Sequence, residues 1–100
     1  AILGVCLVAC NADSVEKKLE KAGYTILAKS TDVSDKVEWT VSAAKGTDTV
    51  LVTKYKNSDD AKAAESKANT TVLGVKAFES VKRVGNVVYT GTEQGVKDAM

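Results

Sequence analysis

Hydrophobic and polar residues alternate along much of the chain, and the period of this alternation indicates the elements. Between residues 37 and 43 the period is two, which predicts a strand with one face in solvent. A turn at Gly46 leads to a second strand over 48–55, so the two strands are expected to form an antiparallel hairpin. The apolar run at 50–52 predicts that this second strand has neighbours and cover on both sides.

A helix is predicted over about residues 14–22, where an apolar stripe of helical period consists of Val15, Leu19 and Ala22. Asp13 is the expected N-cap, because Glu16 follows it at the spacing of a capping box. Gly23 is expected to end the helix, since glycine readily adopts the left-handed conformation found after a helix.

A second helix is expected after residue 58, with Asn57 or Ser58 as its N-cap. Asp59 and Asp60 lie in its first turn, where the helix dipole favours acidic side chains. Its apolar stripe is made of small residues and consists of Ala61, Ala64, Ala68 and Val72. Where this helix ends stays open, because helicity weakens from residue 69 and Gly74 offers a later stop.

Three further strands are predicted over residues 24–29, 79–84 and 86–91. Gly85 and Asn86 suit a two-residue hairpin turn between the last two strands, and Thr92 can cap a final short helix. Strands joined mainly by short turns and followed by helices indicate an α+β fold. We expect a largely antiparallel sheet of about five strands with two to three helices on one face.

Composition and charge narrow the possible partners. The 100 residues are 44% hydrophobic, which is typical of a chain that folds, and their formal net charge is +1. No block of like charge is long enough for a nucleic-acid or polybasic membrane patch, and only 5% of residues are aromatic. We therefore expect no nucleic-acid partner. Trp39 lies on the apolar face of its strand and is expected in the core, with an exposed partner anchor as the minority interpretation.

The sequence contains no histidine, which removes the commonest general base and metal ligand. Asp59 and Asp60 are adjacent, and as helix neighbours they point about 100 degrees apart, so a catalytic pair is not favoured. Asp32 and Asp35 could offer oxygens to calcium but lack the spacing of an EF-hand loop. No glycine pattern of a nucleotide-binding loop is present. We expect no enzyme activity, no cofactor and no metal site.

The first nine residues, AILGVCLVA, form an uncharged apolar run that is too short to cross a membrane as a helix. Such a run is typical of the hydrophobic part of a secretion signal, but also of a buried central strand over residues 2–9. Cys6 and Cys10 would lie about 13 Å apart in a strand, too far for a disulfide. In a helix they would be close, but two soft ligands do not make a structural zinc site.

The end of this run, Leu7-Val8-Ala9-Cys10, resembles the lipobox of bacterial lipoproteins. The resemblance implies that Cys10 receives a diacylglyceryl group and becomes the first residue of the mature protein. Residues 1–9 would then be a signal-peptide remnant and residues 10–100 a single α+β domain. A basic region and an initiator Met do not precede the run, so on this hypothesis the chain is a fragment or a processed product.

The stretches VEKKLEKAGYT and VVYTGTEQGVKDA are similar to sequences of small lipoproteins from low-GC Gram-positive bacteria. This resemblance brings no known activity, but it implies a location on the extracytoplasmic face of the cell membrane, held by the lipid on Cys10. The expected function is a non-enzymatic binding or envelope-associated module whose partner is an unknown protein or small molecule. The alternative is a small cytosolic interaction domain in which residues 2–9 form a buried core strand.

Overall fold

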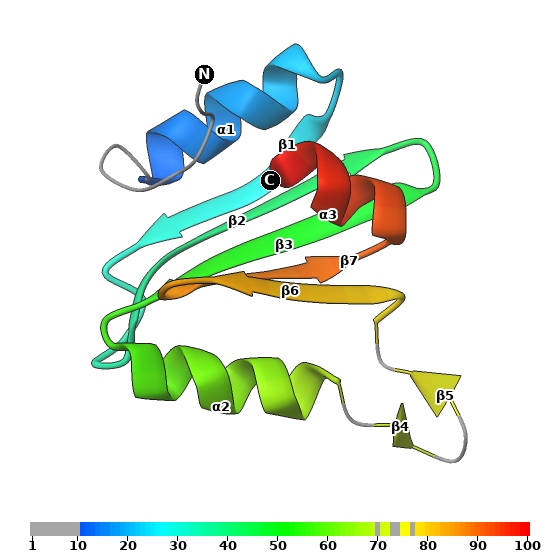
Figure 1. Cartoon of the computed structure of the whole chain (residues 1–100). Helices are drawn as coiled ribbons and strands as arrows, with labels where there is room; N and C mark the ends of the chain where they lie inside the picture. The colour runs from blue at the N-terminus through cyan, green and yellow to red at the C-terminus, as the bar shows by residue number, and fades with distance from the viewer. Residues whose placement is uncertain (1–10, 70, 73–74, 77) are drawn as a thin grey trace.

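The computed structural model describes residues 11–69, 71–72, 75–76 and 78–100 (Figure 1). In chain order their elements are α1 (Ala12–Lys21), β1 (Thr25–Thr31), β2 (Val37–Lys45), β3 (Asp48–Tyr55), α2 (Ser58–Ala68), β4 (Thr71–Val72), β5 (Val75–Lys76), β6 (Ser80–Val84), β7 (Val87–Gly91) and α3 (Glu93–Ala99). The predictions made for Cys6, Cys10, residues 2–9 and Gly74 concern residues outside these described ranges.

The main sheet has the strand order β1-β2-β3-β7-β6, and every neighbouring pair is antiparallel. Two-residue turns join β2 to β3 and β6 to β7, and each contains a glycine with a positive φ, 61° at Gly46 and 59° at Gly85. These backbone angles match the hairpin turns that follow the twist of the strands. β4 and β5 form a separate two-stranded sheet.

Different helices cover the two faces of the sheet. Alternate residues of β7 show which helix packs on which face. Val87 and Tyr89 belong to the core cluster shared with α1 and α3, so these two helices lie on one face, the inner face. Val88 points the opposite way and is buried on the outer face, where α2 packs across β6, β7 and β3. Figure 1 shows α2 on the side of the sheet away from α1 and α3.

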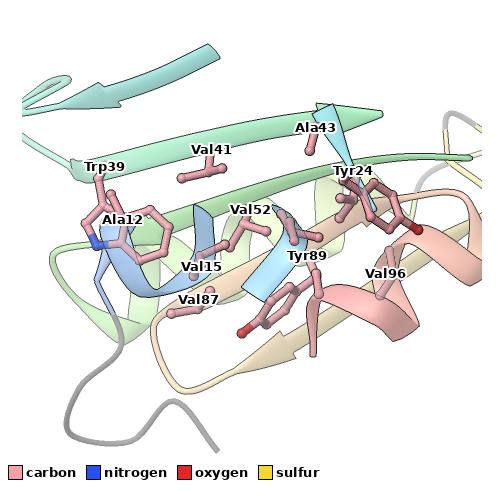
Figure 2. Packing of buried hydrophobic residues seen from close by; sticks show 13 residues of the cluster. Ala12, Val15, Tyr24, Trp39, Val41, Ala43, Val52, Val87, Tyr89 and Val96 are labelled. Carbon is pink, nitrogen blue, oxygen red and sulfur yellow. The ribbon is translucent and has the colours of Figure 1, made fainter. Parts of the chain in front are cut away.

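The inner face holds the hydrophobic core of the described residues (Figure 2). Its buried residues are Ala12, Val15, Leu19, Tyr24, Trp39, Val41, Ala43, Val50, Val52, Val87, Tyr89, Val96 and Ala99. Alternation along β2 and β3 places these side chains on one face, and burying a large one completely contributes about 1.5–3 kcal/mol. Trp39 is 6% exposed, so its predicted place in the core is confirmed.

The outer face is only partly covered. Beneath α2, Val88 and Thr90 are buried, and Arg83 of β6 pairs with Glu65 of α2 at 3.0 Å. Toward β1 the same face presents mainly serine, threonine and alanine, and Leu51 of β3 is 37% exposed. The prediction of cover on both sides of β3 was therefore wrong at Leu51, because α2 does not extend over that part of the strand.

The predicted α+β class is confirmed, with α1 and α3 sharing one face of a five-stranded antiparallel sheet among the described residues. The predicted cap of the first helix was wrong, because Asn11 rather than Asp13 accepts a hydrogen bond from the backbone of Ser14 at 2.9 Å. The Ser14 hydroxyl in turn accepts from the backbone N–H of Asn11, so the capping box sits two residues earlier. Asp13 pairs instead with Lys29 of β1.

The second helix ends at Ala68 with Asn69 as its C-cap, which settles the end that the sequence left open. Its N-cap is Asn57, one of the two predicted candidates, and this side chain accepts a hydrogen bond from the backbone of Asp60 at 2.8 Å. Val72 belongs to β4 rather than to the helix. The predicted hairpin turn at Gly85 and the predicted cap at Thr92 are both confirmed.

Candidate functional site

The acidic residues considered for chemistry lie in two segments: Asp32 and Asp35 in the loop between β1 and β2, and Asp59 and Asp60 at the start of α2. Asp59 and Asp60 occupy the first turn of α2, and Asp60 also accepts a hydrogen bond from the Asn57 side chain at 2.8 Å. Asp32 adopts a positive φ of 52° in the loop after β1, where its backbone N–H donates to Glu38. Among the described residues, no three acidic or cysteine side chains are grouped so that they could hold a metal ion.

The N-terminal end of α1 is the part of the described domain that adjoins Cys10. Asn11 caps the helix there, and the next residue, Ala12, is already buried at 4% exposure. Figure 2 places Ala12 and Trp39 at one end of the core and Tyr24 and Val96 at the other. In the described part of the chain, no helix combines the length and the apolar character that a membrane span requires. The first residues of the described domain therefore lie at the Trp39 end of the core.

A polar network ties the opposite end of the core together. The Tyr24 hydroxyl donates to Asp98 of α3 at 2.7 Å, and Asp98 also accepts from Gln94 at 2.8 Å. Burial, reinforced by this hydrogen bond, raises the pKa of Tyr24 to about 12, and the same bond lowers the pKa of Asp98. Lys45 lies over the Tyr24 ring at 5.8 Å. The raised pKa keeps the phenol protonated, so the network fixes α3 to the loop after α1 instead of supplying a base.

Two glycines let α3 approach the sheet closely. A Cβ atom at Gly91 would lie 2.2 Å from the backbone oxygen of Thr49, and one at Gly95 would lie 2.3 Å from the same oxygen. Thr92 fills the space between them, because its backbone N–H donates to Thr49 at 2.9 Å and its hydroxyl accepts from Gly95 at 3.2 Å. The start of α3 is therefore held at a fixed height above β3 and β7.

This placement of α3 leaves a groove between the helix and the edge strand β6. The groove has a volume of about 270 Å³ and is lined by Ser80, Lys82, Glu93, Val96, Lys97 and Met100. Its floor is largely apolar, while Lys82 and Lys97 are both exposed at its rim. The other charge in the lining is Glu93, at the first turn of α3, whose backbone N–H donates to Glu79 at 2.7 Å. The groove therefore has an acidic end and a basic stretch.

A smaller hollow lies against the outer face of the same strand. It has a volume of about 180 Å³ and is lined by Ala68, Asn69, Phe78, Glu79, Ser80, Val81 and Lys82. Phe78 is 37% exposed there. β6 is thus bordered by a depression on each face, which is the arrangement that an added strand with alternating side chains would fill.

In the described part of the chain, no strand pairs with β6 along the edge that faces away from β7. Since the turn after β6 has two residues, Val84 and Val87 form a hydrogen-bonded pair, and the alternation of an antiparallel ladder continues from there. The N–H and C=O groups of Lys82 then point to β7, and those of Val81 and Arg83 point away from it. Within the described residues, β6 pairs with β7 alone.

The opposite edge strand, β1, is irregular. Its pairing with β2 shifts register between Ile26 and Ala28, so Leu27 bulges out and is 62% exposed. A bulge twists an edge strand and disrupts its ladder, which is a common way to prevent a further strand from adding. Lys29 of the same strand is held by Asp13 and by Glu16. No shift of this kind interrupts β6.

None of the groove residues stands out in the sequence, because Lys82, Val96 and Lys97 are ordinary residues until folding places α3 beside β6. The only sequence signal would have been the pairing of Gly91 with Gly95, which marks the close approach of α3. A comparison with protein-family models, curated proteins and solved structures finds no match for this chain.

Proposed function

We propose that this chain is a lipid-anchored, extracytoplasmic, non-enzymatic binding module whose acylated residue is Cys10. The proposal rests on one observation, the uncharged run that ends in Leu7-Val8-Ala9-Cys10 and is followed at once by the cap of α1 at Asn11. A lipobox cysteine becomes the first residue of a mature lipoprotein, and here the next residue begins a folded helix. The anchor and the domain would thus be contiguous.

The position of the core residues supports the proposed division of the chain into residues 1–9 and residues 10–100. Among the described residues the core cluster begins at Ala12 and extends to Ala99, and it closes the inner face between α1 and α3. These residues come from β2, β3, β7 and both helices, so the packing they make joins both halves of the described sequence. All the residues of this cluster lie within residues 10–100, the mature domain of the proposal.

The short distance between Cys10 and α1 determines how the domain would sit. One residue of extended chain spans about 3.5 Å, so the Trp39 end of the core would face the lipid headgroups and α3 would face away from them. Two or more acyl chains, at about 0.8 kcal/mol for each buried methylene, would make this attachment stable. The groove between β6 and α3 gives the module a surface for a partner.

Metabolic labelling tests the anchor. The natural gene is expressed in its own bacterium with labelled palmitate, as wild type, as Cys10→Ala and as Cys6→Ala. We expect label on the wild type and on Cys6→Ala, because Cys6 lies inside the apolar run, and no label on Cys10→Ala. Equal labelling of the wild type and Cys10→Ala would exclude the proposal and would favour the cytosolic alternative.

A further inference from the structure

We propose that β6 recognises an extended, acidic segment of a partner protein, which adds to the sheet as a sixth strand beside β6. In this mode, backbone hydrogen bonds give affinity and alternate side chains give specificity. The inference adds a partner class to the proposed function and does not depend on the lipid at Cys10.

Backbone geometry provides the first part of the argument. The outward N–H and C=O groups of Val81 and Arg83 are spaced as the next strand of an antiparallel ladder requires. β6 runs for five residues without a register shift, whereas the bulge at Leu27 interrupts the other edge. Of the two edges of the described sheet, β6 is therefore the one that can accept a strand.

The shape of the surface provides the second part. Side chains of an added strand point alternately to its two faces, and β6 has a hollow on each face. On the inner side, an apolar side chain of the partner would contact the exposed side chain of Met100 in the groove. The hollow on the outer face is mainly polar, so small polar side chains of the partner would lie there, beside Asn69 and Ser80. The two hollows thus favour a partner strand that alternates valine-like and threonine-like side chains.

The charged side chains near β6 indicate that the partner strand is acidic. Lys82 and Lys97 lie at the rim of the groove, Arg83 is already paired with Glu65, and Glu93 lies toward the other end. An acidic side chain near the middle of the partner strand would thus meet Lys82 and Lys97. A second copy of this chain fits less well, because an antiparallel pairing about the centre of β6 sets Lys82 opposite the same lysine, and like charges in direct opposition are destabilising.

A matched pair of peptides tests the proposal. The probes are labelled peptides of about six residues, the usual length of a strand, made of valine and threonine with one central glutamate or one central glutamine. Binding is measured by fluorescence anisotropy on the full chain carrying Cys10→Ser, which cannot be acylated. We expect the glutamate peptide to bind about fivefold more tightly than the glutamine peptide, since an exposed ion pair has about this effect.

Variants of the chain assign the effect to the groove. In the double variant Lys82→Met and Lys97→Met, the preference for glutamate should disappear, while Lys36→Met, in the exposed loop between β1 and β2, should keep it. Val81→Pro should weaken both peptides about tenfold, because it removes an outward N–H, and should leave the melting temperature nearly unchanged. If Val81→Pro fails to fold, the lysine variants still decide the question.

Hydrogen exchange locates the bound strand. The glutamate peptide should slow exchange at the amides of Val81 and Arg83 and leave Lys82 unchanged, since the Lys82 amide already bonds to β7. Slower exchange along Thr25–Thr31 in place of β6, equal binding of both peptides, or self-association that protects Val81 without any peptide would each overturn the proposal. A failure here would leave the palmitate experiment on Cys10 unaffected.

Discussion

The inner and outer faces of the sheet are built from the same strands, yet they differ in almost every physical respect. On β3 the neighbours Leu51 and Val52 show the difference, because Val52 is fully buried between the helices and the sheet while Leu51 is 37% exposed. The inner face is apolar and closed by α1 and α3, and the outer face is polar wherever α2 does not reach. Stability therefore comes mainly from the inner face, and the outer face is freer to vary.

The comparison also explains why the groove at β6 has a fixed wall although its rim is made of exposed lysine side chains. Lys82 and Lys97 are exposed, but α3, which defines one wall of the groove, is fixed to the inner face by Val96, by the Thr92 hydrogen bonds and by Asp98. A binding surface with a rigid frame loses less conformational entropy when a partner binds.

The largest contrast is expected from alanine substitutions at the two neighbours on β3. Val52→Ala should lower the free energy of unfolding by about 2–3 kcal/mol, because it removes two buried methyl groups and leaves a cavity. Leu51→Ala removes more atoms, but they are partly in solvent, and the cost should stay below about 1 kcal/mol. Urea unfolding measures both, and equal losses would show that the outer face contributes as much as the inner one.

The close approach of α3 to the inner face is tested by glycine substitutions. Gly95→Ala should cost about 1–3 kcal/mol, since its Cβ would lie 2.3 Å from the backbone oxygen of Thr49 and α3 would have to shift. Gly85→Ala is the matched control, because a Cβ atom at this position would have no atom within 4 Å. Its only cost, about 1 kcal/mol, comes from placing alanine at a positive φ. Thermal unfolding that ranks Gly85→Ala as the more harmful change would contradict this account of the helix.

The polar end of the inner face should make stability depend on pH. The pKa of Tyr24 is raised to about 12 in the folded state, above its ordinary value near 10, so the unfolded chain loses the phenolic proton first. The contribution of Tyr24 to stability should therefore be constant below about pH 10 and be lost as pH rises toward 12. Tyr24→Phe should remove this dependence and cost about 1 kcal/mol at neutral pH through the lost bond to Asp98.

Asp98 should produce the opposite dependence at acid pH. Its pKa is lowered in the folded state, chiefly by the hydrogen bond from Tyr24, so its contribution is present above the ordinary aspartate value and is lost as pH falls through the folded value. Asp98→Asn should flatten the acid limb of the stability curve, which urea unfolding at a series of pH values measures. An unchanged acid limb would show that this carboxylate has no part in holding α3.

Much of the fold could be predicted from the sequence because local patterns dictate it. The alternation of β2, the glycine turns and the Thr92 cap depend on neighbouring residues, and all three lie where the pattern placed them. The cap of α1 was misplaced because Asn11 and Asp13 both precede suitable partners, and only the packing of Ala12 distinguishes them.

Features that join distant parts of the chain could not be predicted. An alanine stripe does not reveal on which face of the sheet α2 packs, and nothing local links Tyr24 to Asp98, 74 residues away. The groove has the same origin, since Lys82 and Lys97 meet only after β7 and α3 fold back beside β6. Whether Cys10 is acylated stays a prediction, because it depends on enzymes outside the molecule.

The smallest effect is expected where the inner face meets solvent at β1. Lys29 lies between Asp13 and Glu16 of α1, and these hydrogen bonds raise the pKa of Lys29 and lower that of Asp13. Lys29 and both carboxylates reach solvent, so screening reduces the attraction, and Lys29→Met should lower the free energy of unfolding in low salt by less than any substitution above. Repeating the urea unfolding in about 1 M NaCl, where the Debye length falls to about 3 Å, should bring variant and wild type together. A larger loss that persists in salt would mean that Lys29 supports the contact of α1 with β1 through its methylene groups, and the inner face would then extend to the edge of the sheet.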